Sequence, residues 1–235
     1  MKAIVIGSGT IGSAVRKALE EKGHQVVSVG RKSGDYQADI SDPESLKALF
    51  SRIGSFDAVA NAAGDVSFGA LEESTDEQWA NSIKFKGMGQ INLVRAALPF
   101  IADRGSFTLV SGVLTDEYLH GGTIGTTINH LVEGFVKGAA VELPRGLRIN
   151  CISPTVLAES VAYHAYFAGF IPVPAWEVGQ AYLRASSTPI TGRIRAEAIA
   201  AGIPVVGVTE TLPAGLHFQQ WQLRQCLELE RALSQ

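Results

Sequence analysis

The sequence predicts an α/β protein built on a doubly wound parallel β-sheet with helices on both faces. Short β-branched runs alternate with segments whose apolar residues recur at helical spacing, and this alternation is typical of βαβ units. The first run ends in a glycine-rich turn that begins at Gly7. The chain has 235 residues, of which 46% are hydrophobic, so it is long enough to bury a sizeable core.

Strands are expected where a short apolar run ends at glycine or at a polar turn. The runs Ala3-Ile4-Val5-Ile6 and Gln25-Val26-Val27-Ser28-Val29 come first, and both are typical of strands in a parallel sheet that is covered on both faces. Four more runs follow. The predicted strands are residues 2–7, 25–29, a short strand that ends at Asp39-Ile40, 56–60, 107–110 and 147–152.

Helices are expected where apolar residues recur three and four positions apart. Ile11, Val15 and Leu19 have this spacing, and Gly23 follows them as a helix stop. The second helix begins at Ser41-Asp42-Pro43-Glu44, where Ser41 and Glu44 have the spacing of a capping box. The predicted helices are residues 11–22, 43–52, 76–101 and 126–143.

Composition excludes several classes of function. Lys plus Arg number 20 and Asp plus Glu number 23, for a formal net charge of −3, which argues against a basic surface for nucleic acid. No apolar run is long enough to span a membrane, and the chain reaches Gly7 too early for a signal-peptide core. Cys151 and Cys226 give neither a disulfide framework nor a zinc spacing. We expect a cytoplasmic protein that binds no metal, no nucleic acid and no membrane.

The turn Gly7-Ser8-Gly9-Thr10-Ile11-Gly12 has the pattern Gly-x-Gly-x-x-Gly between a predicted strand and a predicted helix. In that context the first glycine permits a tight turn, the second lets a pyrophosphate approach the backbone, and the third lets the helix pack closely. The N–H groups at the helix N-terminus then face the phosphates. The alternative is a purely structural turn. The pattern favours a Rossmann-like sheet that binds a dinucleotide.

The end of the second strand indicates which dinucleotide is bound. An NAD site has an acidic residue at this position, which binds the ribose 2′-hydroxyl. Here the residues are Gly30-Arg31-Lys32-Ser33. Two cations and a hydroxyl suit a 2′-phosphate, since arginine binds phosphate through two hydrogen bonds and lysine through a point charge. The sequence therefore favours NADP over NAD, with a solvated basic turn as the alternative.

Further motifs follow the glycine turn in a fixed order. They are Asp39-Ile40, Asn61-Ala62-Ala63-Gly64, Leu109-Val110-Ser111-Gly112, Arg148-Ile149-Asn150 and Ser153-Pro154-Thr155. In this order and spacing the chain resembles the short-chain dehydrogenase/reductase family over about residues 1–197. The resemblance implies an oxidoreductase whose Asp39 and Ile40 contact adenine. It also implies that Asn61 to Gly64 lie beside the cofactor and that Pro154 and Thr155 lie near the nicotinamide, with Thr155 in place of the family's glycine.

The chain departs from the family at the active site. The family's reductases use a Tyr-x-x-x-Lys pair, and this chain has Gly125 and Asn129 at those positions. Glycine has no proton to donate, whereas the Asn129 amide still offers hydrogen bonds to a ribose. The family's structural Asn on the preceding helix corresponds to Lys86, and Ser111 keeps the identity expected of the catalytic serine.

Three residues are candidates for the missing catalytic groups. Lys86 is the first, because burial would lower its pKa toward neutrality; the alternative is a solvated lysine. Ser111 either touches substrate or caps a strand end. Tyr118 either reaches the substrate from its loop or packs there. His120 on the same loop and His130 on the long helix are weaker alternatives, and His130 is expected on a surface or an interface.

Two segments near the C-terminus lie outside these motifs. Residues 156–185 form an insertion that covers the substrate in this family, and its aromatic residues suit an apolar wall, a core under a lid or a partner surface. Residues 198–235 form an atypical extension beyond the domain of residues 1–197. The extension resembles the C-terminal end of metal-binding periplasmic transport proteins, but the rest of such a protein is missing, so no metal is expected.

Three functions are consistent with the sequence. The first is an NADP-dependent oxidoreductase acting on an unidentified carbonyl or alcohol. The second is a non-catalytic NADP(H)-binding sensor or assembly protein, which Gly125 and Asn129 favour. The third is a structural protein that no longer binds nucleotide. Helices such as 76–101 and 126–143 pair between subunits in the resembled family, so a homodimer or homotetramer is expected.

Overall fold

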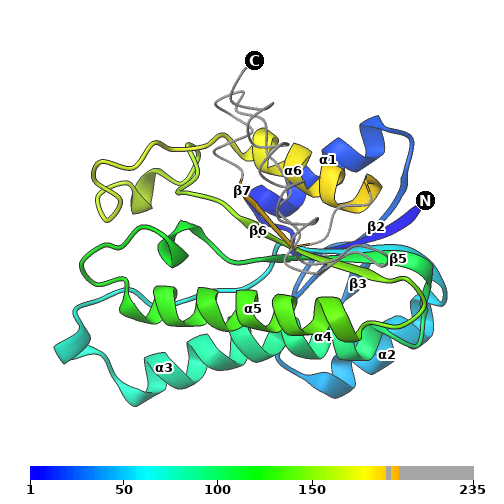
Figure 1. Cartoon of the computed structure of the whole chain (residues 1–235), viewed down its shortest axis with the longest axis horizontal. Coiled ribbons are helices and arrows are strands. Elements are labelled where there is room, and N and C mark those ends of the chain that lie inside the picture. Colours follow the sequence, from blue (N-terminus) through cyan, green and yellow to red (C-terminus); the bar gives the residue numbers. More distant parts are fainter. Residues whose placement is uncertain (189–191, 196–235) are drawn as a thin grey trace, which may run out of the picture.

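The computed structural model describes residues 1–188 and 192–195. Within these residues seven parallel strands form one sheet in the order β3-β2-β1-β4-β5-β6-β7 (Figure 1). The strands are β1 (Lys2–Ile6), β2 (Gln25–Gly30), β3 (Tyr36–Gln37), β4 (Phe56–Asn61), β5 (Ile101–Val110), β6 (Arg148–Ser153) and β7 (Gly192–Arg195). The predicted Rossmann-like α/β fold is confirmed.

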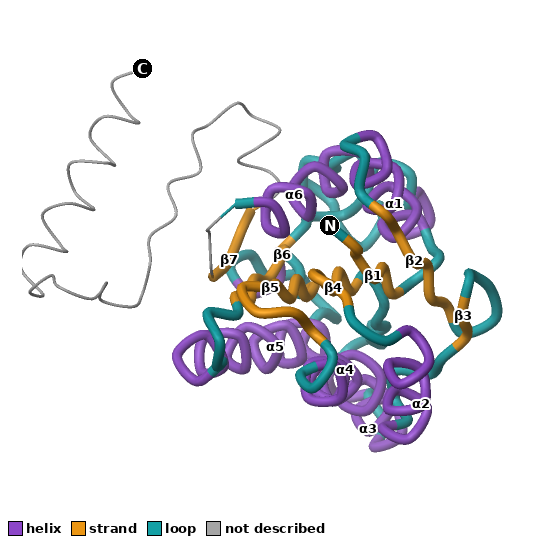
Figure 2. The backbone as a smooth tube through the Cα atoms, turned by 90° about the vertical axis from the view of Figure 1, so that its right-hand side faces the viewer, coloured by secondary structure: helices purple, strands orange, loops and turns teal. Residues whose placement is uncertain are grey.

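Helices cover both faces of the sheet, as Figure 2 shows: α1 and α6 lie on one side and α2, α3, α4 and α5 on the other. The helices are α1 (Thr10–Glu21), α2 (Pro43–Ile53), α3 (Asp76–Ser82), α4 (Gly89–Ala97), α5 (Thr123–Glu142) and α6 (Ala175–Ser187). A π-helical segment, η2 (Ile83–Met88), joins α3 to α4. Three short 3-10 turns are η1 (Leu71–Glu73), η3 (Val113–Thr115) and η4 (Val161–Tyr163).

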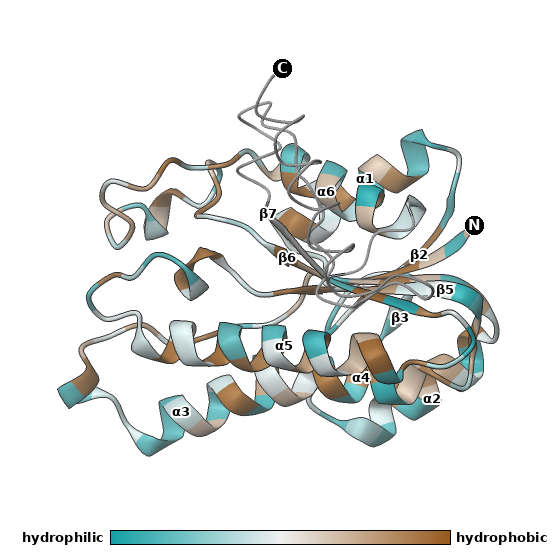
Figure 3. Cartoon of the chain, viewed as in Figure 1, coloured by the Kyte–Doolittle hydropathy of each residue, from teal (hydrophilic) through white to brown (hydrophobic). Residues whose placement is uncertain are grey.

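Alternation along the strands divides the core into two layers. Side chains such as Ile4, Phe107 and Ile149 pack under the helices α2, α4 and α5, whereas Val5, next to Ile4, and Ile152, three residues after Ile149, pack under α1 and α6. Residues an odd number of positions apart on a strand face opposite sides of the sheet. The helices α2, α4 and α5 alternate hydrophilic and hydrophobic residues along their length (Figure 3). Each helix therefore buries one stripe against the sheet.

The order in which strands are added to the sheet reverses at β1, which pairs in parallel with β2 on one side and with β4 on the other. Backbone hydrogen bonds hold these strand ends together: the Gly7 N–H donates to the Val29 carbonyl at 2.8 Å, and the Ala62 N–H donates to the Ile6 carbonyl at 2.7 Å. At such a switch point the crevice outside the carboxyl ends of the strands is the usual ligand site of an open α/β sheet.

The predicted helix 76–101 differs from the structure in two respects. The π-helical segment interrupts it, and it ends at Ala97, before Pro99. Proline cannot continue a helix and disfavours helical backbone in the residue before it. Ile101 is the first residue of β5 and pairs with Phe56 of β4, so placing it in the helix was wrong.

The turn after β3 also differs from the prediction. The strand ends at Gln37, so Asp39-Ile40 lies beyond it. The N-cap of α2 is Asp42, whose carboxylate accepts from the Glu44 N–H at 2.9 Å. Ser41 donates its hydroxyl to Asp39 at 2.8 Å instead. The capping box expected between Ser41 and Glu44 is therefore wrong, because Asp42 stands one residue closer to the helix.

Candidate functional site

Two adjoining cavities lie at the carboxyl ends of the strands. The first, here the turn cavity, measures about 320 Å³ and is bounded by the glycine turn and the end of β2. The second, here the lid cavity, measures about 240 Å³ and lies under residues 156–167. Gly64 and Asp65 line both cavities. The two cavities therefore form one crevice with Gly64 and Asp65 at its middle.

The turn cavity brings together many of the predicted cofactor residues. Those that line it are Gly7, Ser8, Arg31, Asp39, Ile40, Ala63 and Gly64, together with Ile6, Val29, Gly30, Ala38, Asp65 and Phe85. The predicted residues Ile11 and Ala62 line the lid cavity instead. Lys32 is exposed and lines neither cavity. Arg31 and Lys32, both predicted to bind the cofactor, therefore differ in position, because Arg31 lines the turn cavity and Lys32 does not.

The glycine turn is packed too tightly for side chains at two of its three glycines. A Cβ on Gly12 would lie 1.9 Å from the Gly7 carbonyl oxygen, and a Cβ on Gly7, whose φ is +107°, would lie 2.9 Å from the carbonyl carbon of Ala62. Gly9 is different, because a Cβ there meets no atom within 4 Å. Gly9 is also the N-cap of α1 and has no side chain to cap the helix that begins at Thr10. The N–H groups of the first turn thus stay available to an anion.

Polar groups at the end of β2 gather beside the glycine turn. Ser33 donates its hydroxyl to the Ser8 hydroxyl at 2.9 Å. Burial raises the pKa of Asp39, but hydrogen bonds from Ser41 and the positive charges of Arg31 and Lys84 outweigh it and lower that pKa. The Asp35 carboxylate accepts from both the backbone N–H and the hydroxyl of Ser28, and Asp35 lines neither cavity.

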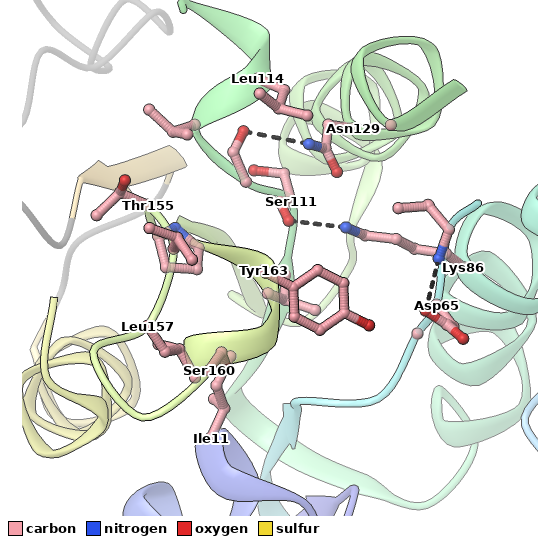
Figure 4. A pocket seen from close by; sticks show the side chains of 18 of the residues that line it. Ile11, Asp65, Lys86, Ser111, Leu114, Asn129, Thr155, Leu157, Ser160 and Tyr163 are labelled. Atoms are coloured by element: carbon pink, nitrogen blue, oxygen red, sulfur yellow. Dashed lines mark hydrogen bonds between the residues drawn. The ribbon is translucent and has the colours of Figure 1, made fainter. Parts of the chain in front are cut away.

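The lid cavity gathers the residues that the sequence placed around a nicotinamide and a substrate. Its lining includes Lys86 from η2, Ser111 and Gly112 from the end of β5, and Gly125 and Asn129 from α5. Pro154 and Thr155 follow β6 on the opposite wall. Figure 4 shows Lys86, Ser111, Asn129 and Thr155 around this cavity.

Lys86 is buried in the wall of the lid cavity, with 8% of its surface exposed. Its Nζ atom donates to the backbone carbonyl of Ser111 at 2.9 Å. Burial lowers the pKa of Lys86 from 10.5 to about 8, and it outweighs the charge interactions with Cys151 and Asp65, which raise that pKa. Gly64, at φ +145°, lets the lysine stem pack closely, because a Cβ there would lie 2.9 Å from Lys86 Cγ. A π-helical segment widens one turn of a helix and is frequent at functional sites.

The hydroxyl of Ser111 is bonded to a buried carboxylate. It donates to Glu133 Oε1 at 2.7 Å, and the Thr115 hydroxyl donates to the same oxygen at 3.1 Å. Glu133 lies on α5, four residues after Asn129, and is buried. Glu133 is not among the predicted site residues, although its spacing from Asn129 places both on one face of the helix. These hydrogen bonds hold the turn after β5 in place, where the Ser111 carbonyl accepts from Lys86 Nζ.

Two polar atoms in the cavity wall have no hydrogen-bond partner among the described residues. Asn129 donates through Nδ2 to the Gly112 carbonyl at 3.3 Å, but its Oδ1 has no partner. The Oγ1 atom of Thr155 is likewise unpartnered. Both residues are at least nine-tenths buried and line the lid cavity. Because unsatisfied buried polar atoms are costly, these two indicate a polar ligand between α5 and the end of β6.

Asn61 lines neither cavity, and its side chain bonds groups at the end of β4 and in α4 instead. Its Nδ2 atom donates to the Ala63 carbonyl at 2.7 Å and to Gln90 at 2.9 Å. Gln90 in turn bonds both the N–H and the carbonyl of Val110. This buried network joins the ends of β4 and β5, which carry the two walls of the crevice.

An aromatic cluster joins Phe68 to residues 156–167, here the lid, at the lid cavity. Phe68 packs against Tyr163, Tyr166 and Phe167 with ring centroids 6.1, 5.8 and 6.0 Å apart. Tyr163 and Phe167 line the lid cavity. The base of the lid is closed by backbone hydrogen bonds of Val173 with Val156 and Ala158. The second half of the predicted insertion is α6, which packs on α1 and the sheet.

The remaining candidates lie away from the crevice. Tyr118 is 69% exposed and does not line either cavity, so its catalytic role stays a prediction. His120 and His130 are exposed, and His130 contacts the Thr126 carbonyl at 3.0 Å. Residues 1–188 and 192–195 contain no cluster of three potential metal ligands and no helix long and apolar enough to cross a membrane. The extension of residues 198–235 lies outside the described residues.

Comparison with known proteins identifies the family. A family model described as enoyl-(acyl carrier protein) reductase matches residues 7–171. Elsinochrome reductase 1 from Elsinoe fawcettii is 26% identical over 200 residues, which cover 72% of this chain and 73% of that protein.

Solved structures agree with that match. The protein lin1944 from Listeria innocua is 40% identical and superposes with a TM-score of 0.81, over 83% of this chain and 98% of the other. A small-chain dehydrogenase in complex with NADPH is 24% identical, with a TM-score of 0.75 over 85% of this chain and 99% of that one. The family model alone spans more than half of the chain, and the fold and crevice agree with it. This chain therefore belongs to the short-chain dehydrogenase/reductase family of oxidoreductases.

Proposed function

We propose that this protein is an NADP-dependent oxidoreductase that interconverts a carbonyl compound and its alcohol. One observation carries the proposal: the turn cavity and the lid cavity share Gly64 and Asp65. A dinucleotide thus has a continuous crevice that leads from Arg31 at one end to Lys86 at the other. Such an elongated ligand needs an anion site, a sugar site and a polar site for the nicotinamide.

The turn cavity fits the phosphate half of the cofactor. A diphosphate lies best over Gly9, where the backbone is open and the N–H groups of α1 begin. A 2′-phosphate has Arg31 beside it, with the hydroxyls of Ser8 and Ser33 bonded to each other nearby. Gly30, the last residue of β2, is followed by Arg31 rather than by an acid that would bind the 2′-hydroxyl of NAD, and Asp35 further along the loop is bonded to Ser28. The solved neighbour that holds NADPH supports the same choice.

The lid cavity fits the nicotinamide half. The unpartnered Oδ1 of Asn129 accepts from a ribose hydroxyl or a carboxamide N–H, and the Thr155 hydroxyl donates to or accepts from the carboxamide. Pro154 lies beside Thr155 in the cavity wall. When bound, the cofactor carries the hydride. The protein's part is to orient the two reactants and to stabilise the charge that develops on the substrate oxygen.

Lys86 is the proposed charge-stabilising residue. Its ammonium has three N–H donors, of which one is bonded to the Ser111 carbonyl. The others are available to a substrate oxygen in the lid cavity. Ser111 takes part through that carbonyl, and its hydroxyl holds the turn in place through Glu133.

The cofactor assignment is tested by titrating the protein with NADPH and NADH before and after Arg31→Ala. Losing a charge-assisted bond to the 2′-phosphate should weaken NADPH binding by about ten- to a hundredfold and leave NADH unchanged. Lys32→Ala is the matched control, since Lys32 lines neither cavity. Equal losses for both nucleotides, or none for NADPH, would exclude the NADP assignment.

A second candidate is a non-catalytic NADP(H)-binding sensor or assembly protein. Gly125 and Asn129 favour it, because Gly125 brings no side chain to the cavity wall and Asn129 brings an amide in place of the family's lysine. Incubation with NADPH and a broad panel of ketones and aldehydes separates the two functions. Turnover of any compound supports the oxidoreductase. NADPH binding without turnover across the panel supports the binding protein.

The proposed assembly is a homodimer or homotetramer in the cytoplasm, acting on a small-molecule substrate. Light scattering after size-exclusion chromatography gives the subunit number, and a monomer would contradict this part of the proposal.

A further inference from the structure

Reduction of a carbonyl requires a proton as well as a hydride. When hydride adds to the carbonyl carbon, the π electron pair of the C=O bond moves to oxygen, and that oxygen must take up a proton to give the alcohol. Lys86, Ser111 and Tyr118 are the catalytic groups predicted from the sequence. The structure leaves the source of this proton open, since Tyr118 lies outside the cavity and the Ser111 hydroxyl is bonded to Glu133.

Few groups among the described residues of the lid cavity can supply a proton. Besides Ser111, the side chains with O–H or N–H groups are Lys86, Asn129, Thr155, Ser160 and Tyr163. An amide such as Asn129 is not an acid in this range, and aliphatic hydroxyls are far weaker acids than a phenol, which ionises near pH 10. The ammonium of Lys86 and the phenol of Tyr163 remain.

Exposure distinguishes the two groups. A proton donor must be recharged from solvent in every turnover. Lys86 is 8% exposed and its Nζ atom donates to the Ser111 carbonyl, whereas Tyr163 is 45% exposed. A phenol at the cavity mouth exchanges its proton with water directly, while the buried ammonium is better placed to stabilise negative charge.

The lid holds Tyr163 in a defined position. The residue ends the 3-10 turn η4, and its backbone N–H donates to the Ser160 carbonyl at 2.9 Å. Its ring packs on Phe68. Figure 4 shows the ring entering the cavity with its hydroxyl toward the side where Lys86 and Asp65 lie. Lid and helix thus present a phenol and an ammonium to the same space.

We propose that Tyr163 is the proton donor of this site, with Lys86 as the cation beside it. The inference rests on the proposed oxidoreductase function. In the step, a hydride joins the carbonyl carbon, the O–H bond of Tyr163 breaks, and its proton forms the new O–H bond of the alcohol. The resulting phenolate is stabilised by the Lys86 ammonium until water returns a proton. Carbonyl, NADPH and a proton become alcohol and NADP⁺.

Tyr163→Phe is the decisive variant, because it removes the hydroxyl and keeps the ring on Phe68. Tyr166→Phe is the matched control: Tyr166 packs on the same Phe68 but does not line the cavity. The first readout needs no turnover. Acetophenone, cyclohexanone and 9-fluorenone are titrated by calorimetry into the protein saturated with NADP⁺, which has no hydride to give. Losing one hydrogen bond should weaken ketone binding about three- to tenfold in Tyr163→Phe.

The second readout is the rate of NADPH-dependent reduction of the ketone that binds. Loss of a positioned proton donor should lower kcat about 10²- to 10⁴-fold in Tyr163→Phe, with NADPH affinity and the unfolding midpoint unchanged. Tyr166→Phe should stay within about twofold of the parent in both readouts.

Each outcome decides the inference. It is overturned if Tyr163→Phe behaves like Tyr166→Phe, or if none of the three ketones binds the NADP⁺ complex. The proposed function is judged separately, by the NADPH titration with Arg31→Ala. A protein that binds NADPH through Arg31 and reduces ketones without need of Tyr163 would keep that function and refute the donor.

Discussion

The Nζ atom of Lys86 lies 2.9 Å from the backbone carbonyl oxygen of Ser111, so a buried ammonium is joined to the end of β5 in the wall of the lid cavity. Lys86→Met removes the charge and keeps most of the volume. We expect kcat for carbonyl reduction to fall about 10²- to 10³-fold, the usual effect of losing one donor to a developing oxyanion, while NADPH affinity stays unchanged.

The neighbouring exposed Lys84 provides the control for that variant. Its ammonium lies over the Phe85 ring, 5.4 Å from the centroid, and it lines neither cavity. Lys84→Met should leave kcat within about twofold of the parent. Steady-state kinetics on both variants make the comparison, and equal rates for the two would mean that the Lys86 ammonium plays no part in the reaction.

Stability should depend on pH through the same lysine. Burial lowers the pKa of Lys86 from 10.5 to about 8, so between these pH values the unfolded chain binds the proton that the folded protein has released. The free energy of unfolding then rises with pH across this window, and the cost of burying the ammonium is fully present below pH 8. Relative to Lys86→Met, the parent should gain up to about 3 kcal/mol from pH 8 to 10.5.

Urea unfolding of both proteins at several pH values measures this effect, because titrations of all other groups cancel in the difference. A difference that stays flat from pH 8 to 10.5 would show that Lys86 keeps its ordinary pKa. A difference that falls with pH would mean that the folded protein raises that pKa.

The glycine turn predicts opposite results at two glycines. Gly9→Ala places its Cβ in open space, so the free energy of unfolding should change by less than about 1 kcal/mol. NADPH should bind at least about tenfold more weakly, because the methyl group lies where a diphosphate approaches the backbone.

At Gly12 the folded protein has no room for a methyl group, since the Cβ would lie 1.9 Å from the Gly7 carbonyl oxygen. Gly12→Ala should therefore lower the free energy of unfolding by about 3 kcal/mol through overpacking. Thermal unfolding and NADPH titration of both variants check the pair. A Gly9→Ala protein that binds NADPH normally would place the diphosphate elsewhere.

Ser111→Ala tests whether the serine acts on substrate or on the fold. Its hydroxyl donates to the buried Glu133 carboxylate at 2.7 Å, and a hydrogen bond to a charged group contributes about 1.5–3 kcal/mol. We expect a loss of stability in that range with kcat within about threefold of the parent. Denaturant unfolding and kinetics decide the matter: unchanged stability with a large loss of kcat would make the hydroxyl a catalytic group.

Much of the fold follows from local sequence. The run Ala3-Ile4-Val5-Ile6 and the glycine turn after it predict a buried strand and a helix start, and the structure places β1 and α1 there. Strand ends are also predictable, because residues after parallel strands meet at one edge of the sheet. For that reason the sequence alone predicts that Gly7, Arg31, Gly64, Ser111 and Thr155 lie at one edge of the sheet, and all five line the two cavities there.

Other features depend on contacts between distant segments. The direction of the Ser111 hydroxyl depends on Glu133, 22 residues later on α5. Tyr163 reaches the cavity because its lid turn packs on Phe68, and no spacing within the sequence relates these two residues. The π-helical segment has no local signal that apolar periodicity would reveal, since a single wide turn shifts the pattern by one position.

The wide turn of the π-helical segment lets one stretch of helix both pack on the sheet and present Lys86 to the crevice. A regular α-helix advances about 100° per residue, so one additional residue in a turn rotates everything after it relative to everything before it. Residues 89–97 can thus keep their buried stripe on the sheet while Lys86 points into the crevice. Deleting one residue from 83–88 would convert the wide turn to regular α-helix. The Lys86 ammonium would then rotate out of the crevice, while the packing of the sheet would be retained.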